Sequence, residues 1–247
     1  MKFKRPSRRT TVTLFVVAVV SLLLDIAFGA FRVVRTDGGE EWQSVDTVAL
    51  PAPSRDGDVP VETSIANRRS RREYGTEPLS RGDLGQLLWA AQGVTRRGSG
   101  YRAAPSAGAL YPLKLYVVVG TPGVEELEPG IYRYRPRRHE LAMGEAGDVQ
   151  QELRRASLDQ EFVAEAAVDL VVCAVDARTT AKYGQRGRQR YVPMEAGHVG
   201  QNVCLQAESL GLATVTVGAF NDDRVRKAVG APADQRPLYV VPVGTRA

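Results

Sequence analysis

The stretch VDLVVCAVD, Val168–Asp176, is an almost uninterrupted apolar run of strand length, and it decides the kind of fold to expect. Such a run, with no polar residue at every second position, is typical of a strand buried on both faces. Two further segments have strand character, LKLYVVVG (113–120) and GIYRYRP (130–136), and in the second of them Tyr132 and Tyr134 share one face. The sequence therefore predicts a mainly buried sheet.

Helical patterns alternate with these strands. In LSRGDLGQLLWAAQG, Ser80 and Asp83 have the spacing of a capping box, apolar residues follow at helical intervals, and Gly93 ends the pattern. PMEAGHVGQNVCLQAESL, residues 193–210, predicts a long amphipathic helix that ends before Gly211. Beyond it we expect a strand in ATVTVGAF (213–220), a short capped helix in NDDRVRKAVG (221–230) and a closing strand in PLYVVPVG (237–244). This alternation predicts an α/β or α+β domain.

The positive charge of the chain is concentrated at its N-terminus. The 247 residues carry a net charge of +5, but residues 1–30 hold five cations and one carboxylate, a net +4, which leaves +1 for residues 31–247. A domain so close to neutral lacks the broad positive field that attracts a polyanion. We therefore expect no nucleic-acid partner.

The first 34 residues predict an export signal or a membrane anchor. Basic residues precede the apolar run Val12–Leu24, and after Asp25 the apolar character continues to Val34. Positive charges before an apolar segment keep the N-terminus in the cytoplasm, so the domain that follows is expected outside it. Cleavage and retention of the segment both remain open, and SRRTTVT (7–13) resembles a twin-arginine signal. We expect residues 35–60, rich in Gly, Pro and Asp, to be a linker, and residues 61–247 to be the folded domain.

Cysteine and histidine give no indication of a metal site. Cys173 lies in an apolar run and Cys204 in a helical pattern, so both are expected to be small buried hydrophobic residues. His139 and His198 lie far apart in the sequence, and neither has a second ligand at metal-binding spacing.

Three short segments have features of a binding site. In NRRSRREYG (67–75), Arg68, Ser70 and Arg72 stand two apart, so an extended chain directs them to one side. Two guanidinium groups and a hydroxyl suit a phosphate monoester, although a solvated loop would have the same composition. APSAGALYP (104–112) and TVTVGAF (214–220) carry glycines that allow a ligand or a partner close to the backbone, or that simply form turns.

These segments, in this order, resemble the FMN-dependent nitroreductase superfamily, and most of all its SagB/ThcOx-type (azoline dehydrogenase-like) branch. The resemblance extends from about Val61 to Gly244 and also includes KYGQRGRQRY (182–191) and VPVG (241–244). It implies an α+β fold with a central mixed or antiparallel sheet flanked by helices, working as a homodimer with FMN at the interface. It assigns the FMN phosphate to Arg68, Ser70 and Arg72, the approach from the partner subunit to Pro105, Ser106 and Ala107, and the edge of the flavin ring to Val217, Gly218 and Ala219.

The resemblance also gives Lys182 and Tyr183 the place of a catalytic Lys-Tyr pair, although a mobile loop with solvent-facing cations is an equal alternative. Either side chain could accept the proton that is released when a carbon next to nitrogen is oxidised. His198 and Glu195 lie three apart on one helical face, and His198 is expected to be a structural, hydrogen-bonded residue and not an acid or base. Three features depart from the family pattern. Val217 replaces a polar residue, Ala109 replaces an asparagine, and Arg246 is the single late basic residue available to a phosphate.

The function expected from this resemblance is that of an FMN-dependent oxidoreductase, which transfers two electrons in a ping-pong cycle between small-molecule or peptide substrates. The alternative is a membrane-tethered module that binds flavin, as a sensor or carrier, without turnover. A basic adaptor without any cofactor is a third possibility.

Overall fold

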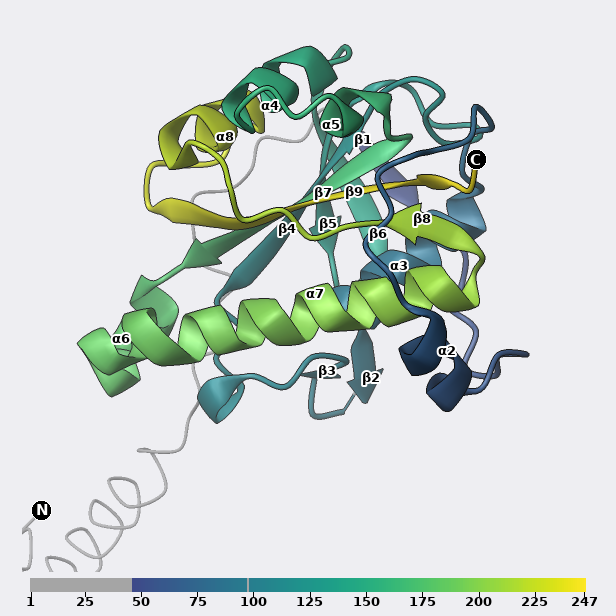
Figure 1. The fold of residues 1–247 in the computed structure, drawn as a ribbon. Helices are drawn as coiled ribbons and strands as arrows, with labels where there is room; N and C mark the ends of the chain where they lie inside the picture. Colours follow the sequence, from purple (N-terminus) through teal and green to yellow (C-terminus); the bar gives the residue numbers. More distant parts are fainter. Residues whose placement is uncertain (1–45, 97) are drawn as a thin grey trace, which may run out of the picture. The chain divides into compact units, whose positions relative to one another are not determined.

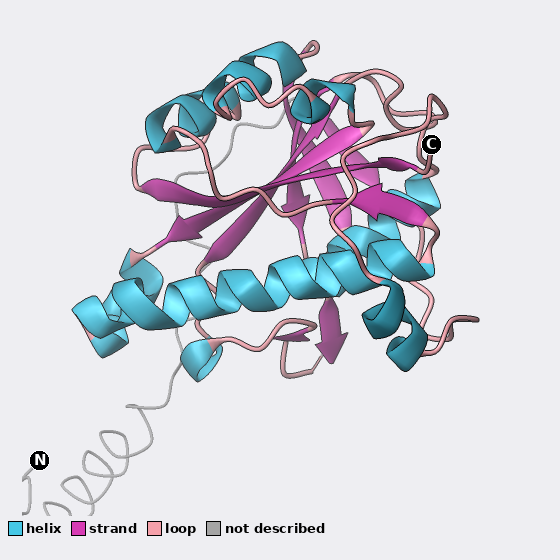
Figure 2. Ribbon diagram, in the orientation of Figure 1, coloured by secondary structure: helices cyan, strands magenta, loops and turns pink. Residues whose placement is uncertain are grey.

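The computed structural model describes residues 46–96 and 98–247, which form a seven-stranded sheet with helices on both faces (Figures 1 and 2). The strand order is β1-β6-β5-β4-β7-β9-β8, and every neighbouring pair is antiparallel. The α+β fold with a central antiparallel sheet is therefore confirmed. The strands are β1 (Asp46–Ala49), β4 (Leu113–Val119), β5 (Gly130–Arg135), β6 (Glu140–Ala146), β7 (Val168–Val175), β8 (Leu212–Thr214) and β9 (Gln235–Thr245).

Strand β7 is the buried strand that its sequence predicts. All eight of its residues are buried, and β4 and β9 pair with it on its two sides. Leu170 and Val172 join one hydrophobic core, whereas Val171 and Cys173 join the core on the opposite face of the sheet. The run is apolar at every position but Asp169 because both faces are covered.

Two helical layers supply these cores. On one face lie α3 (Arg81–Gln92) and the long α7 (Val192–Ser209), with α2 (Val61–Asn67) against α7. On the other face lie α4 (Gln150–Ala156), α5 (Phe162–Glu165) and α8 (Asp222–Ala228). The remaining elements are the hairpin β2 (Val94–Arg96) and β3 (Tyr101–Arg102), the short turn η1 (Ala107–Ala109), α6 (Ala177–Tyr183) and the π-helical turn η2 (Gly187–Tyr191).

The predicted capping box is present at the start of α3. Ser80 precedes the helix, and its Oγ accepts a hydrogen bond of 3.0 Å from the backbone N–H of Asp83. The same hydroxyl donates to the Asp83 carboxylate at 2.7 Å. The helix ends at Gln92, and Gly93 follows as its C-cap, so both ends of this helix could be read from the sequence.

Two boundaries differ from expectation. The strand predicted through Phe220 is wrong, because β8 ends at Thr214 and Val217 pairs only with Val240 through an isolated bridge. Its apolar alternation reflects Val215 and Val217 packing into the core on the α8 face. Asp46–Ala49 forms the edge strand β1, so the folded unit includes residues that we expected to be a linker.

An edge strand such as β1 escapes hydrophobic pattern analysis because most of its side chains are exposed. The predicted signal or anchor, residues 1–34, lies outside the described residues. Within residues 46–96 and 98–247, no helix is both long and apolar enough to cross a membrane.

Candidate functional site

The segment that follows α2 forms one wall of a hollow of about 510 Å³ beside β8 and the end of β9. It is held there by the backbone, since the N–H of Arg71 donates to the Thr214 carbonyl at 3.0 Å and Tyr74 forms a bridge with Arg246. The hollow is lined by Ser70, Arg71, Arg72, Glu73, Ala213, Arg246 and Ala247. Ser70 and Arg72 thus lie where a shared ligand could reach both.

Arg68 lies apart from this lining. It is half-buried at the C-cap of α2, and its positive charge acts on Cys204 of α7. Burial raises the pKa of the Cys204 thiol, and the charge of Arg68 opposes that rise. The assignment of Arg68 to a phosphate stays a prediction.

Three arginines and two carboxylates, Glu73 and Glu208, surround the hollow, which leaves a net positive side-chain charge there. Glu208, at the C-terminal end of α7, pairs with Arg246 at 2.9 Å and lies 4.0 Å from Arg71, so one carboxylate faces two guanidinium groups. The Nε of Arg71 is buried and has no hydrogen-bond partner among the described residues. Arg72 is exposed, with its guanidinium carbon 5.5 Å from the centre of the Phe162 ring. A buried donor without an acceptor, beside two further arginines, fits the oxygens of a phosphate.

The segment Val217–Ala219 offers an open stretch of backbone. Val217 is buried and exchanges two backbone hydrogen bonds of 2.8 and 3.0 Å with Val240. Gly218 and Ala219 are exposed, and no atom lies within 4 Å of the position that a Cβ on Gly218 would occupy. Val217 is anchored to Val240 in the core, so a flat ligand could pass beside Gly218 without displacing the segment.

The turn that contains Pro105, Ser106 and Ala107 is strained. Gly108, Ala109 and Tyr111 have φ values of 63°, 53° and 47°, so two residues other than glycine adopt the left-handed conformation. The N–H of Tyr111 donates to Ser106 Oγ at 2.9 Å, and Arg178 Nη1 donates to the Tyr111 carbonyl at 2.8 Å. Strain of this kind persists only where neighbouring contacts hold the backbone in place.

The predicted catalytic pair lies against this turn. A Cβ on Gly108 would stand 2.9 Å from Tyr183 Oη and 3.2 Å from Lys182 Nζ. The Tyr183 ring packs edge-on against Tyr191, with centroids 5.0 Å apart. The structure therefore brings Lys182 and Tyr183, from α6, to the Pro105–Ala107 turn, more than seventy residues earlier in the chain.

Glu195 lies beneath the same turn. Its side chain, in the first turn of α7, is buried, and burial raises its pKa to about 7. A hydrogen bond from Ser106, the positive charges of Arg102 and Arg178, and a weak hydrogen bond from Gln92 all oppose that rise. The sequence placed Glu195 on the same helical face as His198, and its hydrogen bond to Ser106 could not be read from the sequence.

His198 lies one helical turn further along α7. Its Nδ1 is 3.4 Å from the carbonyl oxygen of Pro105, which is a structural contact with the backbone of the turn. The side chain is exposed. This position agrees with the structural role that its spacing predicts.

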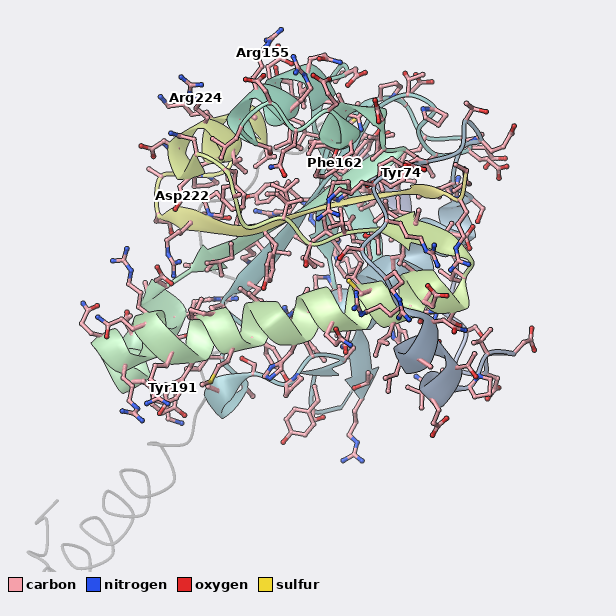
Figure 3. The ribbon with its side chains drawn as sticks, in the orientation of Figure 1. Tyr74, Arg155, Phe162, Tyr191, Asp222 and Arg224 are labelled. Carbon is pink, nitrogen blue, oxygen red and sulfur yellow. The ribbon has the colours of Figure 1, made fainter. Side chains whose placement is uncertain are left out.

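The hollow beside β8 and the Pro105–Ala107 turn lie at different ends of α7. Glu208 belongs to the first and Glu195 to the second, and thirteen residues of helix separate them by about 20 Å. In Figure 3, Phe162, which contacts Arg72, and Tyr191, which contacts Tyr183, lie well apart. Within one chain, Ser70 and Arg72 thus lie in one group, and Lys182, Tyr183 and the Pro105–Ala107 turn lie in another.

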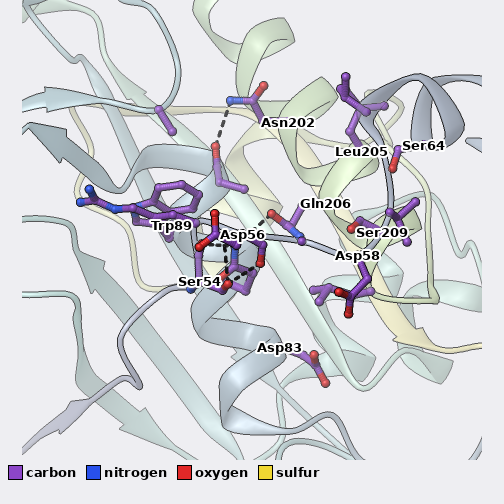
Figure 4. Close-up of a pocket in the computed structure, with 18 of the residues that line it drawn as sticks. Ser54, Asp56, Asp58, Ser64, Asp83, Trp89, Asn202, Leu205, Gln206 and Ser209 are labelled. Carbon is purple, nitrogen blue, oxygen red and sulfur yellow. Dashed lines mark hydrogen bonds between the residues drawn. The ribbon is translucent and has the colours of Figure 1, made fainter.

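A second hollow, of about 650 Å³, lies between residues 52–64, α3 and α7 (Figure 4). Trp89 and Asn202 belong to its lining, and Asn202 donates to the Ala90 carbonyl at 2.9 Å. None of the predicted binding or catalytic residues lines it.

Comparison with known proteins places these features in a family. The family model described as "Nitroreductase family" matches residues 65–245. The chain is 44% identical to MJ1384 of Methanocaldococcus jannaschii over 202 residues, which is 81% of this chain and 98% of that protein. It is 31% identical to the microcin B17-processing protein McbC of Escherichia coli over 199 residues, 73% of this chain and 72% of McbC.

The solved structures agree. A crystal structure from Ralstonia eutropha superposes with a TM-score of 0.72 at 30% identity and covers 81% of this chain and 90% of the other. The E. coli microcin synthetase complex McbBCD, solved with truncated pro-MccB17 bound, contains a chain that superposes with a TM-score of 0.63 at 26% identity. That match covers 81% of this chain and 78% of the other.

Proposed function

We propose that this chain, which belongs to the nitroreductase family and to its SagB-type branch, is an FMN-dependent oxidoreductase with a ping-pong cycle. That it is an oxidoreductase of this superfamily follows from the family itself. The dependence on FMN, the order of the two half-reactions and the choice of a small-molecule or peptide substrate are the proposal. The redox-idle, flavin-binding module is less favoured by these relatives.

The hollow beside β8 supports FMN as the cofactor. Ser70, Arg71, Arg72 and Arg246 surround it, and the unpartnered Nε of Arg71 is the single observation that carries the proposal. These donors would hold the phosphate, and the exposed backbone at Gly218 and Ala219 would leave room for the ring. Bound FMN would supply the capacity to take up and release an electron pair. Arg246, the single late basic residue, would contribute a further guanidinium to the phosphate.

Lys182 and Tyr183 would accept the proton that the substrate releases. A substrate carbon next to nitrogen loses a hydride and a proton when it is oxidised, and the proton needs an acceptor at the site. The Tyr183 Oη and the Lys182 Nζ lie together at Gly108, where Tyr183 as the phenolate, stabilised by the Lys182 ammonium, would accept the proton and become the neutral phenol. The strained turn would fix both relative to the substrate.

The exposed apolar side chains support a homodimer. Of the five large hydrophobic residues exposed in the described part of the chain, four lie on α2, β3 and α7, namely Val61, Ile65, Tyr101 and Met194. Gly197, on α7, has no atom within 4 Å of where its Cβ would stand, and such a site lets a partner approach closely. We propose that this face, termed the α2–α7 face, meets a second copy, so that the Pro105–Ala107 turn reaches the partner's flavin.

We also propose that residues 1–34 export the domain or anchor it to the membrane, with the domain outside the cytoplasm. The support is the basic and apolar pattern of the sequence. Cell fractionation, together with the N-terminal sequence of the mature chain, tests this proposal. A full-length chain recovered from the cytoplasm would contradict it.

One experiment tests the proposed function as a whole. The purified protein should show the absorption of bound flavin, be bleached by dithionite, and turn over with nitroaromatics, quinones or azolines. A colourless protein that remains colourless after FMN is added would overturn the cofactor. A flavin that dithionite reduces rapidly, without turnover of any of the three substrate classes, would favour the redox-idle module instead.

A further inference from the structure

The segment that carries Lys182 and Tyr183 has an unusual charge. Residues 177–192 contain five cations and no carboxylate: Arg178, Lys182, Arg186, Arg188 and Arg190. Residues 31–247 have a net charge of +1, so the +5 of this segment leaves −4 for the remainder. A local positive region on an otherwise acidic domain attracts anions to that region.

The segment is also held in a defined shape. A Cβ on Gly187 would lie 2.9 Å from Thr179 Cγ2 and 3.0 Å from the Thr179 carbonyl oxygen, so glycine is needed where η2 packs against α6. The structure of η2 is π-helical. Such turns are rare in proteins, and those that occur are frequently found at functional sites. The cations thus project from a packed double turn and not from a free loop.

Three of these cations have no carboxylate partner among residues 46–96 and 98–247. Arg188 shares Asp176 with Arg236, which binds that carboxylate through two hydrogen bonds of 3.0 Å, and Arg178 donates to the Tyr111 carbonyl. Lys182, Arg186 and Arg190 are exposed, and among the described residues no carboxylate lies within ion-pair distance of them. We call these three residues the cationic rim.

Two members of the rim, Arg186 and Lys182, lie beside the proposed reaction site, and Arg190 belongs to the same packed turn. Arg186 Nε donates to Tyr191 Oη at 3.0 Å, Tyr191 packs against Tyr183, and Lys182 Nζ lies 5.4 Å from the centre of the Tyr183 ring. The tyrosines therefore hold Arg186 and Lys182 beside the Gly108 turn. A solvated surface would not require its charges to gather at this point.

We propose that the cationic rim binds an anionic group of the substrate, so that the preferred substrate is a small molecule that carries a carboxylate. The inference rests on the proposed function, because it assigns a substrate class to the same site. Guanidinium groups bind carboxylates in directed pairs, and Arg186 and Arg190 would supply them without taking part in proton transfer.

A matched pair of substrates tests the inference. The holoenzyme, with NADH as the electron donor, is assayed with 4-nitrobenzoate and with the neutral 4-nitrobenzyl alcohol as acceptors, and the measured quantity is the ratio of their kcat/KM values. We expect the ratio to favour 4-nitrobenzoate and to fall as salt concentration rises. The double variant Arg186→Gln/Arg190→Gln should lower it about fivefold. Arg155→Gln, which removes an exposed arginine of α4 on the other face of the sheet, is the control and should leave the ratio unchanged.

Binding provides a readout that does not depend on turnover. Calorimetric titration of the same proteins with 4-nitrobenzoate should show weaker binding in the double variant than in the Arg155→Gln control. A protein that turns over neither substrate but shows this loss would contradict the proposed function and support the rim. Equal ratios in the parent protein and the double variant would overturn the rim. If, in addition, the double variant no longer bound phosphatidylserine vesicles, the arginines would be assigned to a lipid surface.

Discussion

The two ends of α7 are built in different ways. At the C-terminal end, Arg71 and Arg246 meet the carboxylate of Glu208 beside an open hollow, and Arg72 is exposed. At the N-terminal end, Glu195 is buried under a turn in which two residues other than glycine are left-handed. The first end offers charges on long side chains, whereas the second fixes a backbone.

This difference follows from what each end would do. A phosphate is held by several cations that can adjust, because charge attraction depends only weakly on small displacements. Proton transfer requires atoms within hydrogen-bond reach, so the groups that perform it need a rigid support. The comparison suggests that substitutions will act on affinity at one end and on rate and pH dependence at the other.

The largest effect is expected from a substitution that disrupts the proposed dimer, because the dimer would bring the N-terminal end of α7 in one chain to the flavin of the other. Ile65→Asp places a carboxylate on the α2–α7 face, and burying it at a dimer interface without a partner should raise the dimer dissociation constant about 10⁴-fold. Sedimentation would show monomer, and flavin would be lost with it. Leu158→Asp is the matched control, since Leu158 is 64% exposed and Ile65 58%, and Leu158 lies beside α4 on the other face. A dimer that survives Ile65→Asp would remove α2 from the interface.

Tyr183→Phe should have the next largest effect. Removing the Tyr183 oxygen at Gly108 takes away the phenolate that would accept the proton, and general acid–base catalysis of this kind is worth about 10³-fold in kcat. Flavin absorption should be retained. Tyr191→Phe alters the other ring of the same pair and should change turnover of a neutral substrate much less. If both variants kept full activity, the N-terminal end of α7 would have no chemical role.

Glu195→Gln should remove a dependence of stability on pH. Burial raises the pKa of Glu195 from 4.5 to about 7, so the protonated carboxyl stabilises the native state. That stabilisation is complete below pH 4.5 and is lost as the pH rises through 7. The variant should therefore gain on the parent protein between pH 5 and pH 8, by about 2 kcal/mol in the free energy of unfolding. Denaturant titrations at the two pH values measure this, and parallel pH curves would show that Glu195 does not titrate in this range.

Arg72→Gln should have the smallest effect. Loss of one exposed guanidinium from the hollow should weaken FMN binding about tenfold. Riboflavin, which has no phosphate, is the ligand control and should bind both proteins equally. An equal loss of affinity for FMN and riboflavin would mean that Arg72 contacts the ring or supports the fold, and the phosphate assignment would fail.

Local patterns predicted much of the fold. Short-range rules predict the apolar run of β7, the Ser80 capping box and the long helix that ends near Gly211. In each case the pattern of apolar and capping residues within the segment itself indicates its structure. The edge strand β1 and the early end of β8 were missed, because their pairing partners lie far away in the sequence. Arg71 was passed over because the alternation of Arg68, Ser70 and Arg72 assumes one straight strand.

The sequence by itself determined the family, the secondary structure of the core and the identity of the Arg-Ser-Arg and Lys-Tyr segments. Only the tertiary structure decided which of these residues meet: Arg246 with Glu208, Lys182 and Tyr183 with Gly108, and Ser106 with Glu195. The physical reason is that propensity, capping and burial act over a few residues. Electrostatic and hydrogen-bond contacts depend instead on distances in space that chain folding sets.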